Sequence, residues 1–415
     1  MKLSGTTGGA MERRRMGGLL ALSIISLAVL PSGVEAQQYS QQAKLVATDS
    51  ATYSLGYSAS LSADGNTALL GGPRRCDDGQ NPSSSVGAAW IFARSDGGWA
   101  QQGAKLVGSD AVGPGVDQGL SVSLSADGNT ALVGGPSDDH GTGAAWVFAR
   151  NGGAWTQQGP KLVRPPIADP YKYGRFGMSV SLSGDGNTAI IGDGYLRSGE
   201  RQPGGAWIFV RSGGVWRQQG EMLIGSGADM GSTGVVRQGE AVAISADGNT
   251  VILGGAWDNQ GVGAAWVFKR NSDSWAQQGS KLVGRPFNMP NPMFGRSVAL
   301  SGDGDTAIVG SNYSGATGAV FVRVNGTWSR QFALQGEKVG LSRDGKTAIT
   351  GFGNSQVVEL FSRKDDSTWS GAGTVSPGRG ADGSTSFAIS PDGAAFLVGV
   401  PCFNNHDGAT WLYTK

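Results

Sequence analysis

The stretch Gly119-Leu-Ser-Val-Ser-Leu-Ser-Ala-Asp-Gly-Asn-Thr-Ala-Leu-Val-Gly-Gly-Pro136 holds two short strand-like runs joined by a tight turn. A polar loop follows, then the apolar run 143–150, a Gly-rich turn and the run 155–163, so the unit supplies four strand-like segments. Residues 121–125 alternate polar and apolar side chains with period two, which is typical of a half-buried strand. Such a unit cannot bury both of its faces alone, so it predicts a fold built from repeats.

The Ser/Gly-x-Asp-Gly turn of this unit recurs seven times along the chain. Its aspartates are Asp64, Asp127, Asp185, Asp247, Asp303, Asp344 and Asp392. Their spacing varies in the polar loops rather than in the strand-like runs. Seven units of four strands, with Gly-rich turns, predict an all-β fold, a seven-bladed β-propeller of four-stranded blades.

The two ends of the chain predict how the ring closes. Residues 39–46 copy the fourth-strand pattern of residues 99–107, with Tyr39 in the place of Trp99. The chain ends on a third-strand pattern at residues 408–413, so the last unit lacks its fourth strand. We therefore expect the N-terminal strand to complete the last blade, because this pairing removes an open sheet edge.

The N-terminal residues and the composition limit where the chain works. A formal charge of +1 with 16% charged residues argues against nucleic acid and other polyanionic partners. Residues 1–36 carry Arg13, Arg14 and Arg15, an apolar run to Leu30, and small residues before Ala36. This pattern predicts a signal peptide, because the run is shorter than the roughly 20 apolar residues that span a bilayer. We expect a secreted chain (periplasmic, cell-surface or extracellular), one propeller domain over residues 37–415, and no membrane span.

Two units keep a Phe-Gly pair ahead of the turn. They read Phe176-Gly-Met-Ser-Val-Ser-Leu-Ser-Gly-Asp-Gly-Asn-Thr-Ala-Ile-Ile-Gly192 and Phe294-Gly-Arg-Ser-Val-Ala-Leu-Ser-Gly-Asp-Gly-Asp-Thr-Ala-Ile-Val-Gly310. These segments resemble FG-GAP repeats, the units of the integrin α-subunit propeller and of many secreted bacterial proteins. The resemblance covers nearly all of residues 39–415. It implies a seven-bladed propeller used for extracellular binding or adhesion, which in most members has no activity of its own.

The resemblance also implies calcium in the turn between the first and second strands. Calcium takes six to eight oxygen ligands, commonly from several carboxylates. Each turn here offers one carboxylate, and the fifth unit, with Asp303 and Asp305, comes nearest to a calcium loop. We predict that the Asp-Gly turns are structural, since Gly accepts positive φ and Asp bonds its own backbone. We accordingly expect no metal or other cofactor.

Strand order assigns the connections between strands to two faces of the ring. The first-to-second and third-to-fourth turns share one face, here called the turn face. The longer second-to-third and fourth-to-first connections share the other, the variable face, where a rigid scaffold commonly carries its binding residues. We expect an extracellular glycan or protein to bind at Trp257, Tyr195, Tyr171, Tyr173, Phe287, Tyr313, Asp138, Asp139, Asn259 and Asn288. The alternative for each of these residues is ordinary loop packing.

Few residues of the sequence support catalysis. The two histidines, His140 and His406, have no companion at the spacing of a metal site or a catalytic motif. Paired carboxylates hydrolyse glycosides, and those in or near variable-face loops are Asp117, Asp193, Glu240 and Asp382. We predict a binding or adhesion module that is not an enzyme. The alternatives are a secreted carbohydrate-active enzyme, either a glycosidase or a lyase, and a structural spacer of a surface assembly.

The two cysteines, Cys76 and Cys402, follow the second strands of the first and last units. These blades become neighbours when the ring closes, and an even pair in an exported protein favours a disulfide. The sequence thus predicts a bridge across the closure point, with two free thiols as the alternative.

Overall fold

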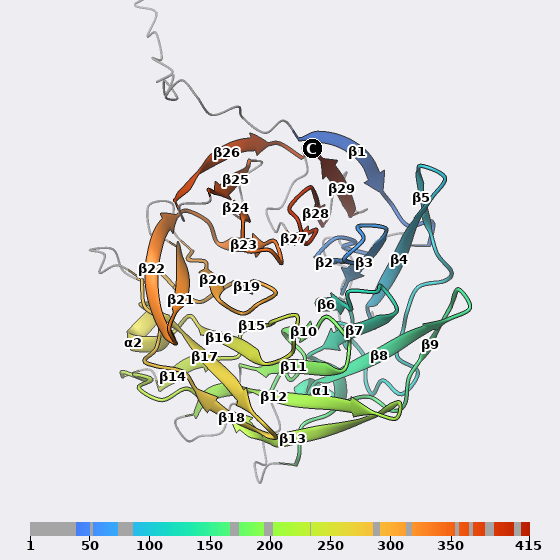
Figure 1. The fold of residues 1–415 in the computed structure, drawn as a ribbon. Coiled ribbons are helices and arrows are strands. Elements are labelled where there is room, and N and C mark those ends of the chain that lie inside the picture. Colours follow the sequence, from blue (N-terminus) through green and yellow to red (C-terminus); the bar gives the residue numbers. More distant parts are fainter. Residues whose placement is uncertain are drawn as a thin grey trace, which may run out of the picture. The chain divides into compact units, whose positions relative to one another are not determined.

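The computed structural model describes residues 39–49, 53–73, 86–166, 174–194, 202–232, 234–284, 291–312, 318–352, 357–364, 368–377, 386–401 and 408–415. Within these residues, seven antiparallel sheets of four strands are arranged in a ring (Figure 1). The predicted seven-bladed β-propeller is confirmed.

Each blade runs from an inner strand beside the ring axis to an outer strand at the perimeter. The first three blades are β2 (Ser58–Leu61), β3 (Thr67–Gly72), β4 (Ala88–Ser95), β5 (Gly98–Gln101); β6 (Ser121–Leu124), β7 (Thr130–Gly135), β8 (Ala144–Asn151), β9 (Ala154–Gln157); and β10 (Val180–Leu182), β11 (Thr188–Asp193), β12 (Gln202–Ser212), β13 (Val215–Leu223). A short strand, β14 (Val235–Gln238), pairs in parallel with β12.

The remaining four blades follow the same order. They are β15 (Ala241–Ile244), β16 (Thr250–Gly255), β17 (Ala264–Asn271), β18 (Ser274–Gln277); β19 (Val298–Leu300), β20 (Thr306–Val309), β21 (Gly318–Val324), β22 (Thr327–Leu334); β23 (Lys338–Leu341), β24 (Thr347–Gly351), β25 (Val358–Arg363), β26 (Trp369–Val375); and β27 (Ser386–Ile389), β28 (Ala395–Val400), β29 (Ala409–Thr414), β1 (Ser40–Leu45).

The N-terminal strand completes the last blade, as the sequence predicts. β1 pairs antiparallel with β29 from Ser40 opposite Thr414 to Leu45 opposite Thr410. Tyr39 donates a hydrogen bond from its hydroxyl to the carbonyl of Gly393 at 2.8 Å. The first and last strands of the chain therefore lie side by side and close the ring by backbone hydrogen bonds.

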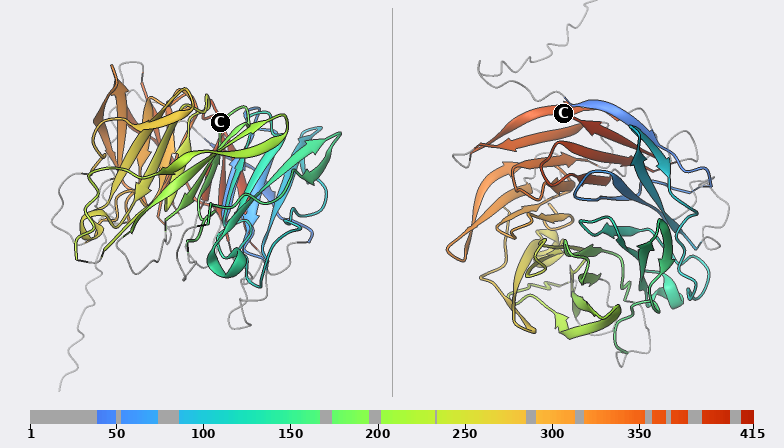
Figure 2. Two further views of the ribbon diagram at one scale, coloured as in Figure 1. Left: turned by 90° about the horizontal axis from the view of Figure 1, so that it is seen from below. Right: turned by 45° about the vertical axis from the view of Figure 1, so that its right-hand side comes forward.

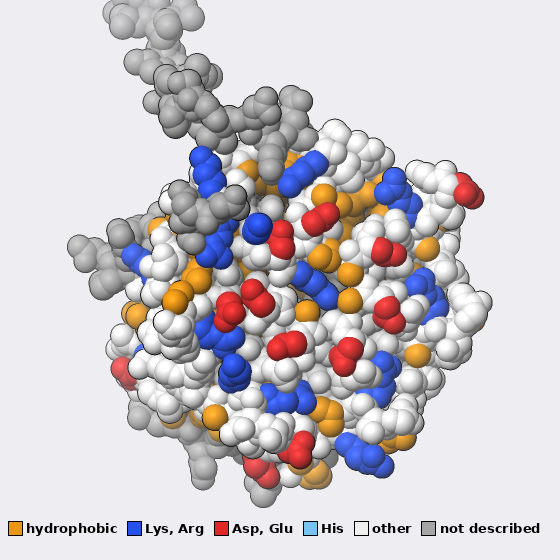
Figure 3. All heavy atoms as spheres, viewed as in Figure 1, with side chains coloured by type: hydrophobic (Ala, Val, Ile, Leu, Met, Phe, Trp, Pro, Cys, Tyr) orange, Lys and Arg blue, Asp and Glu red, His pale blue; other side chains and the backbone are white. Residues whose placement is uncertain are grey.

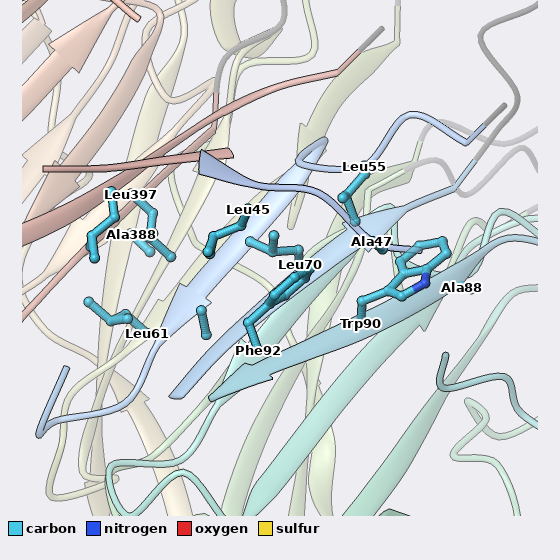
Figure 4. Packing of buried hydrophobic residues seen from close by; sticks show 12 residues of the cluster. Leu45, Ala47, Leu55, Leu61, Leu70, Ala88, Trp90, Phe92, Ala388 and Leu397 are labelled. Atoms are coloured by element: carbon cyan, nitrogen blue, oxygen red, sulfur yellow. The ribbon is translucent and has the colours of Figure 1, made fainter. Parts of the chain in front are cut away.

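A buried apolar cluster joins the seventh blade to the first (Figure 4). Leu45 of β1 packs with Leu397 of β28, and both belong to the same cluster as Leu70 and Trp90 of the first blade. These side chains are almost fully excluded from water. Closure of the ring thus buries side chains from both ends of the chain in one core.

Glycines let the backbones of neighbouring blades approach closely near the axis. A Cβ atom on Gly134 of β7 would lie 2.0 Å from the carbonyl oxygen of Gly177, which precedes the inner strand of the next blade. Four further pairs repeat this approach: Gly71 with Gly119, Gly192 with Gly239, Gly254 with Gly295, and Gly399 with Gly56. No other residue fits at these second-strand positions without a shift of the backbone.

The Asp-Gly turns are held by their own hydrogen bonds. Ser125 Oγ donates to Asp127 Oδ1 at 2.5 Å, and the same oxygen accepts the backbone N–H of Asn129 at 2.9 Å. The Asp turns of the other six blades repeat both bonds. Partial burial alone would raise the pKa of Asp127, but these hydrogen bonds outweigh it and hold the pKa below its ordinary value.

The repeated Gln-Gln pair of the outer strands links neighbouring blades. Gln157 of β9 accepts the backbone N–H of Ser109, in the loop that enters its own blade, at 2.9 Å. Gln158 accepts hydrogen bonds from Trp216 Nε1 at 3.2 Å and Arg211 Nη1 at 3.0 Å in the next blade. Each residue of the pair therefore holds a different junction, which explains why the pair recurs.

The two faces of the ring differ in their connections. The one-turn segments α1 (Asp138–Gly141) and α2 (Asp258–Gly261) lie on the same side, the variable face (Figure 2, left). On the opposite side, acidic and basic side chains are interspersed around the ring (Figure 3). Among the described residues, no helix has the length and apolar character required to cross a membrane.

Candidate functional site

Asp138, a predicted binding residue, holds the base of a variable-face loop. It is buried, its carboxylate pairs with Lys161 Nζ at 2.5 Å, and it accepts the backbone N–H of Val112 at 2.7 Å. In the fourth blade, Asp258 makes the same two contacts with Lys281 and Asp229. These side chains therefore shape the loops from within and leave their neighbours to face the solvent.

The residues that follow these buried aspartates project from the loops. Asp139 and His140 adopt positive φ angles of 45° and 59°, and Asn259 has a φ of 49°. His140 and Asn259 are exposed, and His140 Nδ1 lies 3.5 Å from Asp139 Oδ1. These residues lie on the variable face, as expected, at the surface of separate blades.

Trp257 connects the fourth-blade loop to the ring axis. Its backbone N–H donates to the carbonyl of Val236 at 3.1 Å, and the guanidinium of Arg237 stacks over its indole ring at 4.8 Å. The carbonyl of Arg237 in turn accepts the backbone N–H of Glu240 at 3.1 Å. Trp257 therefore contacts Arg237, and Arg237 in turn holds the backbone of Glu240, which lies beside the ring axis.

A cavity of about 340 Å³ lies on the axis, among the starting residues of the inner strands. Because inner strands begin at the variable face, the cavity occupies that end of the central channel. Its lining residues are Tyr57, Ser58, Ala59, Leu120, Ser121, Val122, Met178, Ser179, Val180, Glu240, Ala241, Val242, Arg296, Ser297, Val298, Lys338, Val339, Ser386 and Phe387. We call this cavity the axial pocket.

Serine hydroxyls line the axial pocket and also join adjacent blades. The hydroxyls of Ser58 and Ser386 donate to the carbonyls of Gly119 and Gly56 at 2.9 and 2.8 Å. The hydroxyls of Ser121, Ser179 and Ser297 instead accept the backbone N–H groups of Val180, Val242 and Val339, at 3.0, 2.8 and 3.2 Å. The serines that donate, Ser58 and Ser386, keep oxygen lone pairs that can accept a hydrogen bond from a ligand. The three serines that accept keep an O–H group that can donate a hydrogen bond to a ligand.

Two blades lack the serine at this position, and the charged side chains of the pocket lie on these blades and on the blade between them. Ala241 stands at the serine position in the fourth blade and Lys338 in the sixth. Glu240 and Arg296 precede that position in the fourth and fifth blades, and all four residues line the pocket. Arg296 Nε pairs with Glu337 at 2.8 Å. The charged side chains thus gather on one sector of the ring, over blades four to six.

Burial shifts the titration of two side chains in this sector. It raises the pKa of the Glu240 carboxyl, although the cations Arg237, Arg296 and Lys338 act in the opposite direction. Burial also lowers the pKa of the Lys338 ammonium. Among the described residues, Glu240 Oε2 has no hydrogen-bond partner. A partly buried carboxyl with a raised pKa is suited to donate a proton or a hydrogen bond to a ligand.

Arg343 lies on the turn face, where turns of different blades contact one another. The turns meet there through hydrogen bonds from blade to blade, such as the Ala63 N–H to the Ala126 carbonyl at 2.8 Å. Arg343 of the sixth blade reaches the third, where a Cβ on Gly184 would lie 3.0 Å from its Nη1. Burial lowers the pKa of this guanidinium. Arg343 therefore places a positive charge between the turns of the sixth and third blades.

Other predicted carboxylates lie away from the axial pocket. Asp193 is fully buried with Arg164 Nε at 3.5 Å, and burial raises its pKa to about 7 against the opposing effects of Arg164 and Trp207. Asp117 is buried and accepts a hydrogen bond from Ser137 Oγ at 2.7 Å. Of the four carboxylates considered for catalysis, Glu240 is the described residue that lines the pocket.

Several predictions fall outside the described residues. These are the signal peptide 1–36, the aromatic and polar residues Tyr171, Tyr173, Tyr195, Phe287, Asn288 and Tyr313, the residues Asp382 and His406, and the cysteines Cys76 and Cys402. The described residues contain no group of three or more His, Cys, Asp or Glu side chains placed to hold a metal ion. In the fifth blade, Asp305 pairs with Arg323 Nε at 2.6 Å, so one of the two candidate calcium ligands already has a cationic partner.

Comparisons with known proteins support the fold. No family model matches the chain, and no curated protein matches its sequence significantly. A crystal structure from Bacteroides uniformis ATCC 8492, of a protein provisionally assigned as a 6-phosphogluconolactonase, matches with a TM-score of 0.53 and 15% sequence identity. The match covers 77% of this chain and 85% of that chain. The shared feature is the fold. The FG-GAP resemblance accordingly holds for the propeller architecture, and no family model supports that family specifically.

The prediction that the chain is not an enzyme is wrong. It rested on the scarcity of histidines and on the resemblance to FG-GAP repeats, since most FG-GAP proteins have no activity of their own. The solved structure that shares the fold is instead assigned to an enzyme class. The axial pocket also holds a carboxyl of raised pKa, Glu240, whose surroundings the linear sequence did not reveal. The fold therefore gives no ground for excluding catalysis.

Proposed function

We propose that the chain is a secreted protein that binds the end of an extracellular glycan in the axial pocket. The observation that carries this proposal is the lining of the pocket, where serine hydroxyls surround a sector of charged side chains. Sugars present hydroxyl groups that both donate and accept hydrogen bonds, and the serines offer both partners. A cavity of about 340 Å³ lies within the size range of small-molecule sites.

The apolar part of the pocket suits the same ligand. Leu120, Met178 and Phe387 line it beside the serines, and Tyr57 adds an aromatic ring. Sugar rings carry C–H faces that pack against such side chains while their hydroxyls meet polar ones. The leader-like residues 1–36 support an extracellular partner. The exposed variable-face residues Asn259 and His140 are placed to contact the rest of a longer glycan.

A glycan and extracellular-protein array tests this function. Wild-type protein is expected to bind a glycan with or without calcium, and Ala241→Leu is expected to lose at least about tenfold in affinity. Ala241 lines the pocket, so a larger side chain there fills the space that the ligand needs. Ala154→Leu, on the exposed edge of β9, is the matched control and should bind as wild type does. A ligand held equally well by Ala241→Leu would place binding elsewhere.

A second candidate function is hydrolysis of a bond in the bound sugar. The observation in its favour is Glu240, whose carboxyl lines the pocket, has an unpaired Oε2 among the described residues, and has a pKa raised by burial. In its protonated form, this carboxyl gives its proton to the leaving oxygen while water attacks the adjacent carbon; the proton that the water loses passes to solvent, and Glu240 is protonated again from solvent. The similarity in fold to a structure assigned as a lactonase is consistent with such chemistry.

Glu240→Gln tests the hydrolytic role. With a panel of methyl glycosides, whose leaving oxygen must be protonated, and glucono-δ-lactone, the substitution is expected to lower kcat by about 100-fold or more, because it removes the proton donor. Wild-type activity should fall as the pH rises through the raised pKa of Glu240, since only the protonated form donates. Glu221→Gln, on the exposed outer strand β13, is the control and should retain full activity. Equal activity of both variants would exclude Glu240 as the acid.

A further inference from the structure

Lys338 departs from the pattern of the ring in a way that costs stability. Five blades have serine at this position, and each serine makes a hydrogen bond to the next blade. Lys338 has no hydroxyl to offer the seventh blade, and its ammonium is partly buried. A partly buried cation without a close ion pair is unfavourable, so a lysine at this position favours a ligand site.

The cations and anions around Lys338 leave its charge uncompensated by an ion pair. Glu337 favours the charged form of Lys338 electrostatically, but its carboxylate is already paired with Arg296 Nε at 2.8 Å. Glu240 also favours the charged form of Lys338 electrostatically, while burial raises the pKa of its own carboxyl. Among the described residues, no carboxylate forms a close ion pair with the Lys338 ammonium, and Glu337 and Glu240 act on it only through longer-range electrostatics. The pocket thus presents an ammonium group on one side and hydroxyl groups on the other.

We propose that the axial pocket selects anionic sugars, with Lys338 as the residue that binds the carboxylate or phosphate. This inference rests on the proposed function and names the ligand class for that site. Lys338 contacts the anionic group, the serine hydroxyls around the axis contact the sugar hydroxyls, and the Glu240 carboxyl, whose Oε2 has no hydrogen-bond partner among the described residues, contacts the same ligand. Lysine binds such anions as a compact point charge, without the fixed geometry of arginine.

The arrangement also sets a pH dependence for binding. Burial favours the neutral amine of Lys338, whereas a bound anion favours the ammonium form. Affinity for an anionic sugar should therefore fall as the pH rises through the lowered pKa of Lys338. A neutral sugar should show no such loss, since it does not need the charge.

Titration calorimetry with D-glucuronate, D-glucose 6-phosphate and D-glucose tests the inference. Wild-type protein is expected to bind at least one of the two anionic sugars about tenfold or more tightly than glucose, which corresponds to about 1.4 kcal/mol. Lys338→Ser should abolish that preference. This variant restores the majority residue of the ring and is expected to fold. Lys269→Ser, which removes an exposed cation, is the matched control and should keep the preference.

The outcomes separate this inference from the proposed function. A preference for glucuronate supports a carboxylate ligand, and a preference for glucose 6-phosphate supports a phosphate ligand. Equal binding of all three sugars, or a preference that survives Lys338→Ser, would overturn the inference and leave sugar binding in the pocket intact. If none of the three binds, the inference is wrong, and the array experiment with Ala241→Leu decides the proposed function independently.

Discussion

Deleting residues 39–46 is expected to destroy the cooperative unfolding of the propeller. The deletion removes β1, which buries Leu45 between the last and first blades and pairs with β29 along its length. A fully buried leucine contributes about 1.5 to 3 kcal/mol, and each backbone hydrogen bond about 0.5 to 1.5 kcal/mol. Their sum is about 5 kcal/mol or more, which approaches the roughly 5 to 15 kcal/mol that stabilises a folded protein.

Thermal unfolding followed by circular dichroism measures this effect. The truncated chain should lack a sharp transition, and a synthetic peptide of residues 37–49 should restore it when added in excess. Gln41→Ala with Gln42→Ala is the control, because both side chains are exposed on the same strand and their loss should leave Tm nearly unchanged. A truncated chain that melts as wild type does would show that β1 is not needed for closure.

The second large effect is expected for Gly254→Ala. A Cβ atom on Gly254 would lie 1.9 Å from the carbonyl oxygen of Gly295 in the next blade. The contact is between two backbones, so no flexible side chain can move to relieve it. We expect a loss of about 3 kcal/mol or more in the free energy of unfolding. Tm should fall by roughly 5 to 10 °C or the chain should fail to fold.

Gly371→Ala is the matched control for this substitution. Gly371 lies in the outer strand β26, where an added Cβ would meet no atom within 4 Å. Alanine there should be neutral or slightly stabilising, because it restricts the unfolded chain without a clash in the folded one. Similar urea midpoints for Gly254→Ala and wild type would refute the close approach of the fourth and fifth blades.

The architecture was predictable because short sequence patterns that determine local structure repeat along the chain. The Asp127 turn and its six equivalents fix the number of blades, since each turn forms from adjacent residues of the chain. The closure by β1 was predictable because residues 39–46 share the sequence pattern of residues 99–107, and this pattern is typical of the fourth strand of a blade. These features depend on short-range sequence and on the period of the repeat.

The axial pocket was predictable in part. The sequence placed Trp257 and Glu240 on the variable face, yet it gave no sign that Arg237 links them. The signal that was missed is the exception within the repeat. Lys338 and Ala241 stand where five blades have serine, and aligning the inner strands would have shown it. That these side chains share one cavity depends on the curvature of the ring, which a linear pattern does not contain.

For the loop residues, the sequence predicted their position in the fold but not their role. Asp138 is of a type that suits ligand binding, but it is buried against Lys161 and supports the loop. Sequence alone does not distinguish these roles, because the pairing partner lies 23 residues away and in another strand connection. The polar composition of a loop therefore predicts its position on the variable face better than it predicts contact with a ligand.

The most direct test of the account is a crystal structure of the protein with the glycan that the array identifies. We predict density for the sugar in the axial pocket, with an anionic group at Lys338 and hydroxyl groups at Ser121 and Ser179. Density only at the perimeter, on outer strands such as β9 or β13, would contradict the central claim that the pocket is the ligand site.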